Sequence, residues 1–286
     1  MICSLDHTNL TNQTSLTPHI LHASPSPRSY DSTIYTFGLP DNKSLSLPVC
    51  ACLLLNAPGK GRKEGGGKDD FDGSDAVRPY TPISDNSMLG QFELLVKRYD
   101  GGAVSQYLHS LEPGNASVQF KHIKFNVKAP YPFEGKKNFT MLCAGSGITP
   151  VYQALHKLMK TPGDDRKVTV IYGNKSPKDI LLREEIDAMV KAAPGRLKVV
   201  HVIGNAPDEP LPDGFGSTET FTAMPGWVDE AKIREHAFPP SEDTMVFVCG
   251  LPPMYANLCG PRNEKAVGEA TVLGKLGYTE TMVAKM

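Results

Sequence analysis

The pattern of hydrophobic and polar positions changes about halfway along the chain. Before residue 135, short apolar stretches alternate with turns rich in glycine and proline. The clearest expected strands are 32–39, 47–55, 91–99, 117–120 and 123–127, and a short helix is expected over 104–111. Many short strands separated by such turns are typical of antiparallel all-β structures. The first half therefore predicts an antiparallel β-barrel.

After residue 135, unbroken apolar stretches alternate with helical ones. The expected strands are 139–144, 167–172, 197–203 and 244–249. The expected helices are 151–160, 178–191, 228–235 and 263–276, with a long polar loop over 204–226. Continuous apolar strands that alternate with helices indicate a parallel sheet covered on both faces. We therefore expect a two-domain β plus α/β chain whose second domain is a doubly wound parallel sheet.

Two segments fit neither pattern. Residues 1–28 show no steady periodicity and end in Ser24–Pro25–Ser26–Pro27, which predicts an irregular or disordered lead-in. Residues 58–75 are rich in Gly, Lys and Asp and predict a mobile, solvated insertion between two strands. The expected domains are thus 29–134 and 135–286. Because the first barrel strand is hard to find, either the lead-in contributes an unusual strand or the barrel is imperfect.

Composition narrows the classes of protein. With 30 basic and 31 acidic residues the net charge is −1, which argues against an electrostatic nucleic-acid binder. The longest apolar run, 47–55, is far shorter than the ~20 residues that span a bilayer, and the first thirty residues do not resemble a signal peptide. Six dispersed cysteines favour a reduced, cytoplasmic setting. Cys50 and Cys52 lack a second pair at zinc spacing, so we expect no metal site.

Three segments suggest nucleotide binding. The first, Gly145–Ser146–Gly147–Ile148–Thr149–Pro150, lies between an expected strand and an expected helix. Small residues let a turn approach a phosphate, and a helix N-terminus offers free N–H groups and a positive dipole end. Pro150 suits the first helical position, where no N–H is needed. A tight turn without a ligand is the alternative, because the third glycine of the usual dinucleotide fingerprint is absent.

The other two segments are less specific. Cys249–Gly250–Leu251–Pro252–Pro253–Met254 follows the last expected parallel strand, where open α/β sheets bind ligands. The alternative is that Cys249 is only a small buried residue. In Arg78–Pro79–Tyr80–Thr81–Pro82, an arginine can clamp a phosphate, a tyrosine can cover an aromatic ring and a threonine can hydrogen-bond its edge. Taken alone, an ordinary edge strand is the better interpretation of this segment.

Together and in this order, these segments resemble the NADH-cytochrome b5 reductase family. The flavin module of assimilatory nitrate reductase and the wider ferredoxin reductase-like group share the plan. The resemblance covers about Ser29 to Met286. It includes two further segments, Gly101–Gly102–Ala103–Val104–Ser105–Gln106–Tyr107–Leu108 and Lys178–Asp179–Ile180–Leu181–Leu182–Arg183–Glu184–Glu185. It implies an FAD-binding barrel domain followed by an NAD-binding domain.

The resemblance also implies roles for single residues in the FAD half. Arg78, beside Pro79, would hold the FAD phosphates, and Tyr80 would pack against the flavin. Thr81 would lie near the reactive N5 edge of the flavin and influence the transfer step. The side chains expected to line FAD are Leu95, Lys97 and Tyr99. The donors expected at the pyrophosphate come from Gly101, Gly102, Val104 and Ser105.

In the NADH half, the implied binding turn comprises Gly145, Gly147, Thr149 and Pro150. Thr149 would lie between flavin and nicotinamide. Cys249 would touch the nicotinamide and affect hydride transfer, in a pocket shaped by Gly250, Pro252 and Met254. Asp179 matches an acidic position that would repel the extra phosphate of NADPH, although Lys175 and Lys178 lie close by.

The implied function is an FAD-dependent NADH reductase that passes single electrons to a haem protein such as cytochrome b5. One alternative is an electron-input module for a nitrate reductase or a desaturase. Another is a non-enzymatic nucleotide-binding derivative that has lost FAD, because Lys121–His122–Ile123 and Cys50–Ala51–Cys52 depart from the family pattern. We expect a monomer. Many relatives are held at the endoplasmic reticulum or mitochondrial outer membrane by an N-terminal segment that we do not find, which leaves peripheral association with their cytosolic faces open.

Overall fold

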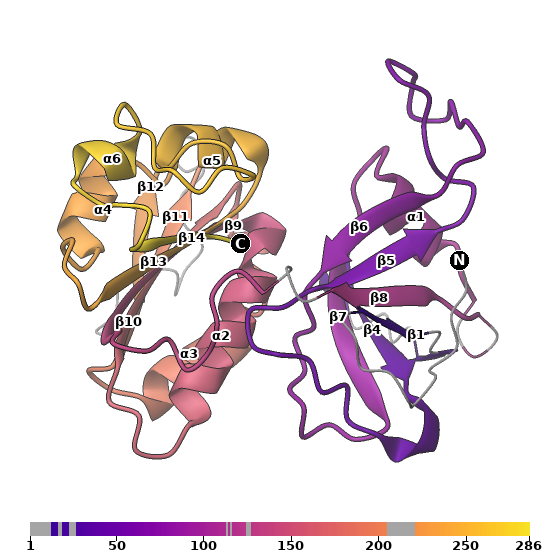
Figure 1. The fold of residues 1–286 in the computed structure, drawn as a ribbon, viewed down its shortest axis with the longest axis horizontal. Coiled ribbons are helices and arrows are strands. Elements are labelled where there is room, and N and C mark those ends of the chain that lie inside the picture. The colour runs from indigo at the N-terminus through magenta and orange to yellow at the C-terminus, as the bar shows by residue number, and fades with distance from the viewer. Residues whose placement is uncertain are drawn as a thin grey trace. The chain divides into compact units, whose positions relative to one another are not determined.

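The computed structural model describes residues 13–16, 19–22, 27–112, 114, 116–123, 127–204 and 221–286. The chain divides into two compact units, Met1–Val127 and Lys128–Met286 (Figure 1). The boundary expected from the sequence lies a few residues later, after residue 134. The expected fold class is confirmed, with antiparallel sheets in the first unit and a parallel sheet in the second.

The first unit contains two antiparallel sheets. In one sheet, β4 pairs with β7 along one edge and with β2 and β3 along the other. The other sheet has the order β1-β8-β5-β6, which makes β6 an edge strand. The strands are β1 (Gln13–Leu16), β2 (His19–His22), β3 (Pro27–Ser29), β4 (Ser32–Gly38), β5 (Leu53–Ala57), β6 (Ala76–Tyr80), β7 (Gln91–Lys97) and β8 (Gln119–Ile123). The short helices are η1 (Pro40–Asn42) and α1 (Ala103–His109).

Aromatic side chains from both sheets form the core of this unit. Phe37 stacks on Phe92 with ring centroids 5.1 Å apart, and Phe120 meets both rings edge-on at 5.0 and 5.4 Å. All three side chains are buried. Along β5, Leu53 and Leu55 point inward at alternate positions, the period expected of a strand with one buried face. This core holds β6, which carries the predicted Arg78, Pro79 and Tyr80, and α1, which carries Val104 and Ser105.

The lead-in contributes strands, which is the first of the two alternatives that the sequence left open, although an irregular segment was the main expectation. β1 pairs with β8, and β2 pairs with β4 through a register shift. Because strand formation depends on pairing with neighbours more than on local preference, a segment without clear alternation can still become an edge strand. The rest of residues 1–26 lies outside the described residues.

The second unit is built on a six-stranded parallel sheet of order β12-β11-β10-β9-β13-β14. Its strands are β9 (Asn138–Ala144), β10 (Lys167–Asn174), β11 (Leu197–Ile203), β12 (Phe221–Pro225), β13 (Thr244–Cys249) and β14 (Val283–Lys285). Its helices are η3 (Gly145–Gly147), α2 (Ile148–Lys160), η4 (Pro177–Asp179), α3 (Arg183–Ala192), α4 (Glu230–His236), α5 (Pro252–Leu258) and α6 (Val272–Lys275). Figure 1 shows α2 and α3 on one side of the sheet and α4, α5 and α6 on the other.

The two faces of this sheet bury alternate residues of the same strands. Leu142 and Ile171 belong to the cluster that includes Ile233 of α4 and Tyr255 of α5. Their neighbours along the strands face α2 and α3, because successive strand residues point to opposite faces. Covering both faces requires apolar side chains at nearly every strand position, as the continuous apolar runs indicated.

Several expected elements differ from the structure. Residues 263–276 form a helix only at α6, because Gly268 and Gly274 bring two backbone segments together: a Cβ on Gly274 would lie 2.2 Å from the Gly268 carbonyl oxygen. The Pro252–Pro253 turn instead starts α5, since proline fits the first helical positions. The expected helix over 178–191 is interrupted between η4 and α3. The loop expected over 204–226 contains β12, and 205–220 lies outside the described residues.

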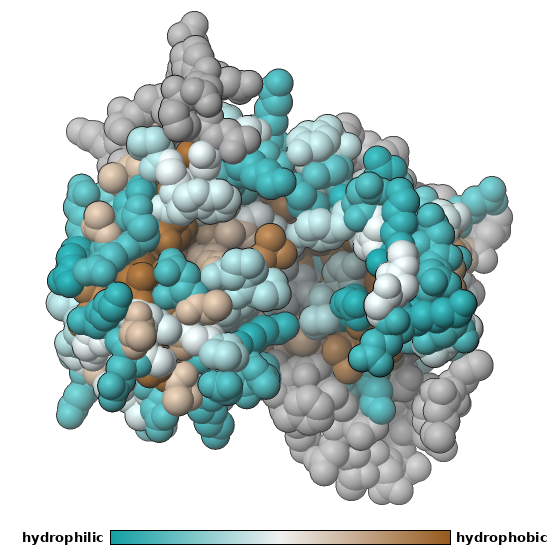
Figure 2. All heavy atoms as spheres, turned by 90° about the horizontal axis from the view of Figure 1, so that it is seen from above, coloured by the Kyte–Doolittle hydropathy of each residue, from teal (hydrophilic) through white to brown (hydrophobic). Residues whose placement is uncertain are grey.

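Figure 2 shows brown, apolar areas scattered among teal ones on the face that it presents. Exposed large apolar side chains are few among the described residues. These side chains are Tyr30, Val77, Leu89, Tyr99, Trp227 and Leu251. Three of these, Val77, Tyr99 and Leu251, lie within or next to segments predicted to bind nucleotides. No helix in the part of the chain described by the structure is both long and apolar enough to cross a membrane.

Candidate nucleotide-binding sites

The strand order of the parallel sheet reverses between β9 and β13. From β9, the chain adds β10, β11 and β12 on one side and then returns to place β13 on the other. Ligands of open α/β sheets bind beyond the carboxyl ends of the strands at such a switch point. The Gly145–Gly147 turn follows β9, and Cys249 ends β13. Two of the three predicted nucleotide segments therefore meet at this position.

The two turns lie against each other. A Cβ added to Gly147 would be 2.3 Å from the Cys249 carbonyl oxygen and 3.1 Å from the Gly250 nitrogen. A Cβ on Gly250 would be 2.5 Å from the sulfur of Met254. Gly145 has a φ of +52° and open space beside it. Glycine is thus required at 147 by a close backbone approach and suits 145 by its left-handed conformation.

Helix α2 begins directly at this turn. Its thirteen residues start at Ile148, so Pro150 is the third helical residue rather than the first, as the sequence suggested. It still lies in the first turn, where backbone N–H groups have no partner within the helix. The Thr149 hydroxyl donates to the Ser146 carbonyl at 3.2 Å, and Thr149 is 8% exposed. This bond holds the turn, and the Ile148 N–H donates to the Gly145 and Ser146 carbonyls. The positive dipole end of α2 makes the turn suited to an anion.

A tyrosine that the sequence analysis missed also supports the turn. The Tyr172 hydroxyl, on β10, donates to the Gly145 carbonyl at 3.0 Å and accepts from the Leu181 backbone N–H at 3.2 Å. Burial, followed by the nearby Cys143, raises the pKa of Tyr172 well above its ordinary value. The phenol therefore stays protonated and keeps its donor role. A polar residue within an otherwise apolar strand was the available signal.

Tyr172 belongs to a row of side chains across the sheet. In register, Cys249 of β13 neighbours Cys143 of β9, which neighbours Tyr172 of β10 and then His201 of β11. Burial, and secondarily Arg183, lowers the pKa of His201 to about 4. Burial, and secondarily Cys249, raises the pKa of the Cys143 thiol. Cys143, Tyr172 and His201 are accordingly neutral at physiological pH.

Asp179 is 5% exposed and caps the η4 turn. Its Oδ2 accepts from the Ser176 backbone N–H at 3.1 Å and from the Ser176 hydroxyl at 2.8 Å. The carboxylate thus fixes the segment after β10. Its expected effect on NADPH stays a prediction.

A hollow of about 440 Å³ lies beside the second turn. It is lined by Gly250 and Pro252, both predicted, and by Tyr255 and Arg262, which were not. The Tyr255 hydroxyl and Arg262 Nε each donate to the Met286 carbonyl at 2.6 Å. The hollow gives this side of the sheet a concave polar and aromatic surface next to Cys249.

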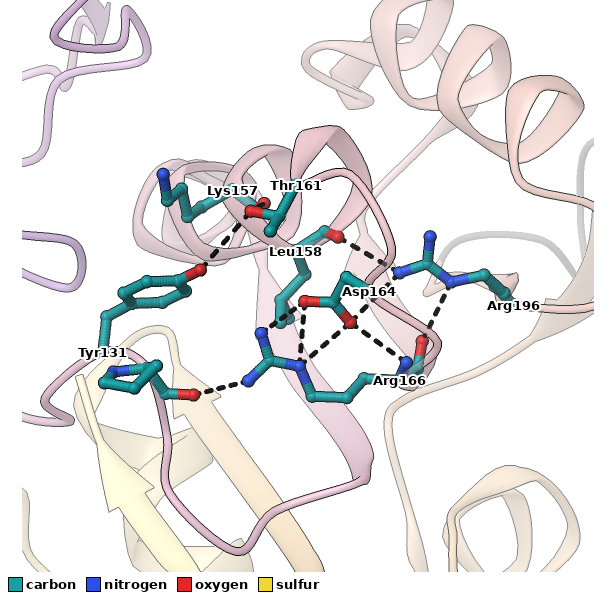
Figure 3. A network of polar contacts seen from close by, with 8 residues as sticks. Tyr131, Lys157, Leu158, Thr161, Asp164, Arg166 and Arg196 are labelled. Carbon is teal, nitrogen blue, oxygen red and sulfur yellow. Dashed lines mark hydrogen bonds and ion pairs between the residues drawn. The ribbon is translucent and has the colours of Figure 1, made fainter.

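A second hollow, of about 430 Å³, is lined by residues 132–137 and 161–166. These residues precede β9 and β10, so the hollow lies at the amino ends of the strands. Figure 3 shows the network beside it, in which Asp164 binds both Arg166 and Arg196. Nucleotide sites of such sheets lie at the opposite ends of the strands, and this network therefore serves the packing of the unit.

In the first unit, β6 carries the predicted Arg-Pro-Tyr segment on an edge strand. Arg78 and Pro79 are exposed, and the neighbouring Val77 is 43% exposed. An edge position tolerates Pro79, which has no N–H to donate. The Arg78 side chain donates only to the Val77 carbonyl at 2.8 Å among its recorded hydrogen bonds. The strand thus presents a cation and apolar surface at its outer edge.

The end of β6, at Tyr80 and Thr81, is more enclosed than the exposed part of the strand around Arg78. Tyr80 is half-buried, and burial, followed by the nearby Tyr99, raises its pKa. Thr81 is 9% exposed. Leu95 is only 3% exposed and belongs mainly to the interior. Lys97 forms an ion pair with Asp31 at 3.0 Å. These are the surroundings of the residues predicted to contact the flavin.

The predicted pyrophosphate turn is held by α1. The Ser105 hydroxyl donates to the Gly102 carbonyl at 3.1 Å and accepts from the Tyr99 backbone N–H at 3.2 Å. A Cβ on Gly102 would lie 2.4 Å from Ser105 Oγ, so glycine is required there. Gly101 has a φ of +77°, and Val104 is buried below the turn. The Ser105 hydroxyl thus shapes the turn. Its expected donation to the pyrophosphate stays a prediction.

The residues in both units fit nucleotide cofactors. Gly145 and Gly101 have left-handed φ values of +52° and +77°, and Gly145 has open space beside it, as in glycine turns whose backbone approaches a phosphate. The first unit adds the exposed Arg78, and the second adds the start of α2 at the switch point. The structure brings Gly147, Cys249 and Gly250 together, and it leaves the roles of all these residues as predictions.

The comparisons with known proteins decide the family. The model of the oxidoreductase FAD-binding domain matches residues 26–125, and that of the oxidoreductase NAD-binding domain matches 141–260. NADH-cytochrome b5 reductase 2 of Saccharomyces cerevisiae is 35% identical over 261 residues, covering 90% of this chain and 78% of the yeast protein. The chain belongs to the NADH-cytochrome b5 reductase family. It is thus an oxidoreductase that uses FAD and NADH, as the sequence indicated.

Two further relatives support the same assignment. An Arabidopsis thaliana NADH-cytochrome b5 reductase-like protein is 34% identical, over 90% of this chain and 73% of the plant protein. Among solved structures, the cytochrome b5 reductase domain of Ulva prolifera nitrate reductase has a TM-score of 0.68 and 26% identity. The match covers 85% of this chain and 89% of that domain. The resemblance found in five short segments therefore extends over both units.

Proposed function

We propose that this chain is an NADH-cytochrome b5 reductase, which oxidises NADH and passes electrons singly to a b5-type haem protein. The observation that carries the proposal is the contact of the Gly145–Gly147 turn with Cys249 at the switch point, downstream of an FAD-type unit in the same chain. FAD supplies the redox chemistry, because a flavin accepts a hydride from NADH and returns the two electrons one at a time.

The chain's own residues bind and orient the two cofactors. In the second unit, the N–H groups at the start of α2 are suited to the NADH diphosphate, and Tyr172 holds the Gly145 carbonyl that shapes the turn. In the first unit, Arg78 offers the FAD phosphates a bidentate cation, and Tyr80 offers an aromatic face to the flavin. Thr81 and Cys249 are the side chains proposed to contact the reacting rings. Hydride transfer needs no general base.

The proposal is tested by mixing the FAD-loaded chain with purified cytochrome b5 and NADH and following the haem spectrum. We expect rapid haem reduction with NADH and at least tenfold slower reduction with an equal concentration of NADPH. Equal rates with both nucleotides would contradict the role proposed for Asp179. Absence of haem reduction by a chain whose flavin is reduced would contradict the acceptor.

A second candidate acceptor is the haem domain of a nitrate reductase. It is favoured by the match to the reductase domain of Ulva prolifera nitrate reductase. The same experiment with that haem domain in place of cytochrome b5 distinguishes the two, because the correct acceptor is reduced with the higher kcat/KM. The reading in which FAD has been lost is disfavoured by the FAD-binding domain match over residues 26–125.

We further propose a monomer that works in the cytoplasm, in peripheral contact with a membrane that carries its acceptor. The five described cysteines, Cys50, Cys52, Cys143, Cys249 and Cys259, form no disulfide with one another, which is typical of a reducing compartment. Light scattering of the FAD-loaded chain tests the monomer, and cell fractionation tests the location.

A further inference from the structure

The insertion between β5 and β6 is a folded hairpin, although its composition predicted a mobile loop. Within residues 58–75, a β-bridge joins Arg62 to Phe71, and the Gly61 N–H donates to the Ser74 carbonyl at 2.7 Å. A Cβ on Gly61 would lie 1.9 Å from Ser74 Oγ, so the two arms are in close contact. Figure 1 shows this segment as the purple loop that extends beyond β5 and β6, at the end of the unit that carries α1.

This hairpin contacts the turn predicted to bind the FAD pyrophosphate. Arg62 Nη2 donates a hydrogen bond to the Gly101 carbonyl oxygen. Lys68 Nζ lies 3.6 Å from Asp100 Oδ1, and a Cβ on Gly101 would be 3.4 Å from Lys68 Cβ. The turn around Gly102 is thus held by Ser105 of α1 and also by two cations of the insertion.

Arg62 retains hydrogen-bonding capacity next to this turn. Its Nε is buried and has no hydrogen-bond partner among the residues that the structure describes. A buried N–H of a charged group is costly when it lacks an acceptor, so the hydrogen bond from Nη2 to the Gly101 carbonyl is the polar contact that holds this guanidinium. A guanidinium carries its N–H donors in a rigid planar fork, which fixes the direction of that bond.

Carboxylates of the same hairpin do not satisfy this donor. Asp70 pairs with Lys63 at 3.0 Å, and Asp75 accepts from Asn56 at 2.8 Å. The hydrogen bond from the Asn56 side chain, and to a smaller extent that from the Gly59 backbone N–H, holds the pKa of Asp75 below its ordinary value. These negative charges have their own partners within the hairpin and at its base, which leaves Arg62 as the cation aimed at the Gly101 turn.

We infer that the 58–75 hairpin is part of the FAD site: Arg62 holds the pyrophosphate turn in place through the Gly101 carbonyl, so that FAD binding at this turn depends on the hairpin. The inference rests on the proposed flavin function of the first unit. It assigns a role in FAD binding to a segment outside the strands that carry the family's motifs. Arg62 is accordingly a positioning residue for the turn.

The test is the affinity of the FAD-free full chain for FAD, measured by quenching of flavin fluorescence. We expect Arg62→Gln to weaken FAD binding about tenfold or more, the range for loss of a hydrogen bond to a charged group. Arg62→Lys should restore part of the affinity, because it keeps the charge without the fork. Lys63→Gln removes the same charge from the same hairpin without reaching Gly101 and should change the affinity less than about twofold.

Trypsin gives a readout that does not depend on any substitution. Lys60, Lys63 and Lys68 are cleavage sites within the hairpin, and FAD should slow cleavage there about tenfold because it stabilises the turn to which Arg62 is bound. Equal affinities of Arg62→Gln and Lys63→Gln, or cleavage that FAD does not slow, would overturn the inference. A folded wild-type chain that binds no FAD would instead overturn the proposed function.

Discussion

The close approach of Gly147 to Cys249 makes the nucleotide turn sensitive to a single methyl group. We expect Gly147→Ala to lower the free energy of unfolding by about 1–3 kcal/mol, because its Cβ would lie 2.3 Å from the Cys249 carbonyl oxygen. We also expect NADH affinity to fall at least tenfold. Urea unfolding and NADH titration measure both. Gly67→Ala, which has open space around it, is the control and should leave both unchanged.

The Tyr172 hydroxyl supports the same turn from below. Tyr172→Phe removes the donor to the Gly145 carbonyl and the acceptor for the Leu181 N–H, which leaves two buried groups unpaired. We predict a loss of about 1–3 kcal/mol in the free energy of unfolding, with weaker NADH binding. Tyr30→Phe, at an exposed position, is the matched control. Equal stability of the two variants would show that these hydrogen bonds contribute nothing.

Cys249 is predicted to act on the transfer step more than on binding. Cys249→Ser should reduce the limiting rate of flavin reduction about tenfold or more, because a small shift of the nicotinamide removes the alignment needed for transfer. Its effect on the NADH dissociation constant should be smaller. Stopped-flow reduction over a range of NADH concentrations separates the two, with Cys52→Ser as control. A normal limiting rate would withdraw Cys249 from the proposed site.

Among the elements, the join between α2 and β10 depends on one carboxylate. The Asp164 side chain is 3% exposed and pairs with Arg166 and with Arg196, which precedes β11 (Figure 3). Burial by itself raises the Asp164 pKa, but hydrogen bonds from Arg166 and the charges of both arginines outweigh it and hold the pKa below its ordinary value. The network therefore stabilises the ionised form.

The lowered pKa of Asp164 determines how its contribution to stability depends on pH. Because the folded-state pKa of Asp164 is lowered, its contribution is complete above the unfolded pKa of about 3.9 and is lost as the pH falls through the folded value. Asp164→Asn should cost about 2–4 kcal/mol of unfolding free energy at pH 7 and less near pH 3, below the unfolded pKa. Urea unfolding at both pH values measures this, with the exposed Asp165→Asn as control. A cost that does not change with pH would contradict the ion-pair account.

Elements buried on both faces were the most predictable from sequence. β9, β10, β11 and β13 follow their apolar runs closely, because a strand covered on both sides needs apolar residues throughout. The lead-in strands β1 and β2 were missed because pairing with β8 and β4, rather than local pattern, makes them strands. The hairpin at 58–75 was missed because polar side chains and backbone hydrogen bonds fold it, which composition does not reveal.

The candidate sites were predictable to a similar degree. Glycine spacing after a strand located the turn at Gly147, and sheet topology explains why Cys249 lies beside it. Tyr172 and Arg62 escaped sequence reasoning, because each acts across a long sequence separation on a carbonyl of the turn. Residues that hold a site through backbone carbonyls leave no local motif.

At the scale of the whole molecule, two compact units contribute separate chemistry within one chain. The first has the FAD-type strand and turn, and the second has the NAD-type switch point. Family membership over 90% of the chain ties both to one reaction. The central claim is therefore that NADH reduces an FAD held by this same polypeptide.

The visible absorption spectrum of the purified full chain, supplied with FAD and recorded before and after anaerobic NADH addition, tests this claim most directly. We predict the spectrum of a protein-bound flavin, which stays with the chain through gel filtration and bleaches when NADH is added. A folded chain that releases its FAD, or one whose bound flavin remains oxidised in excess NADH, would contradict the account.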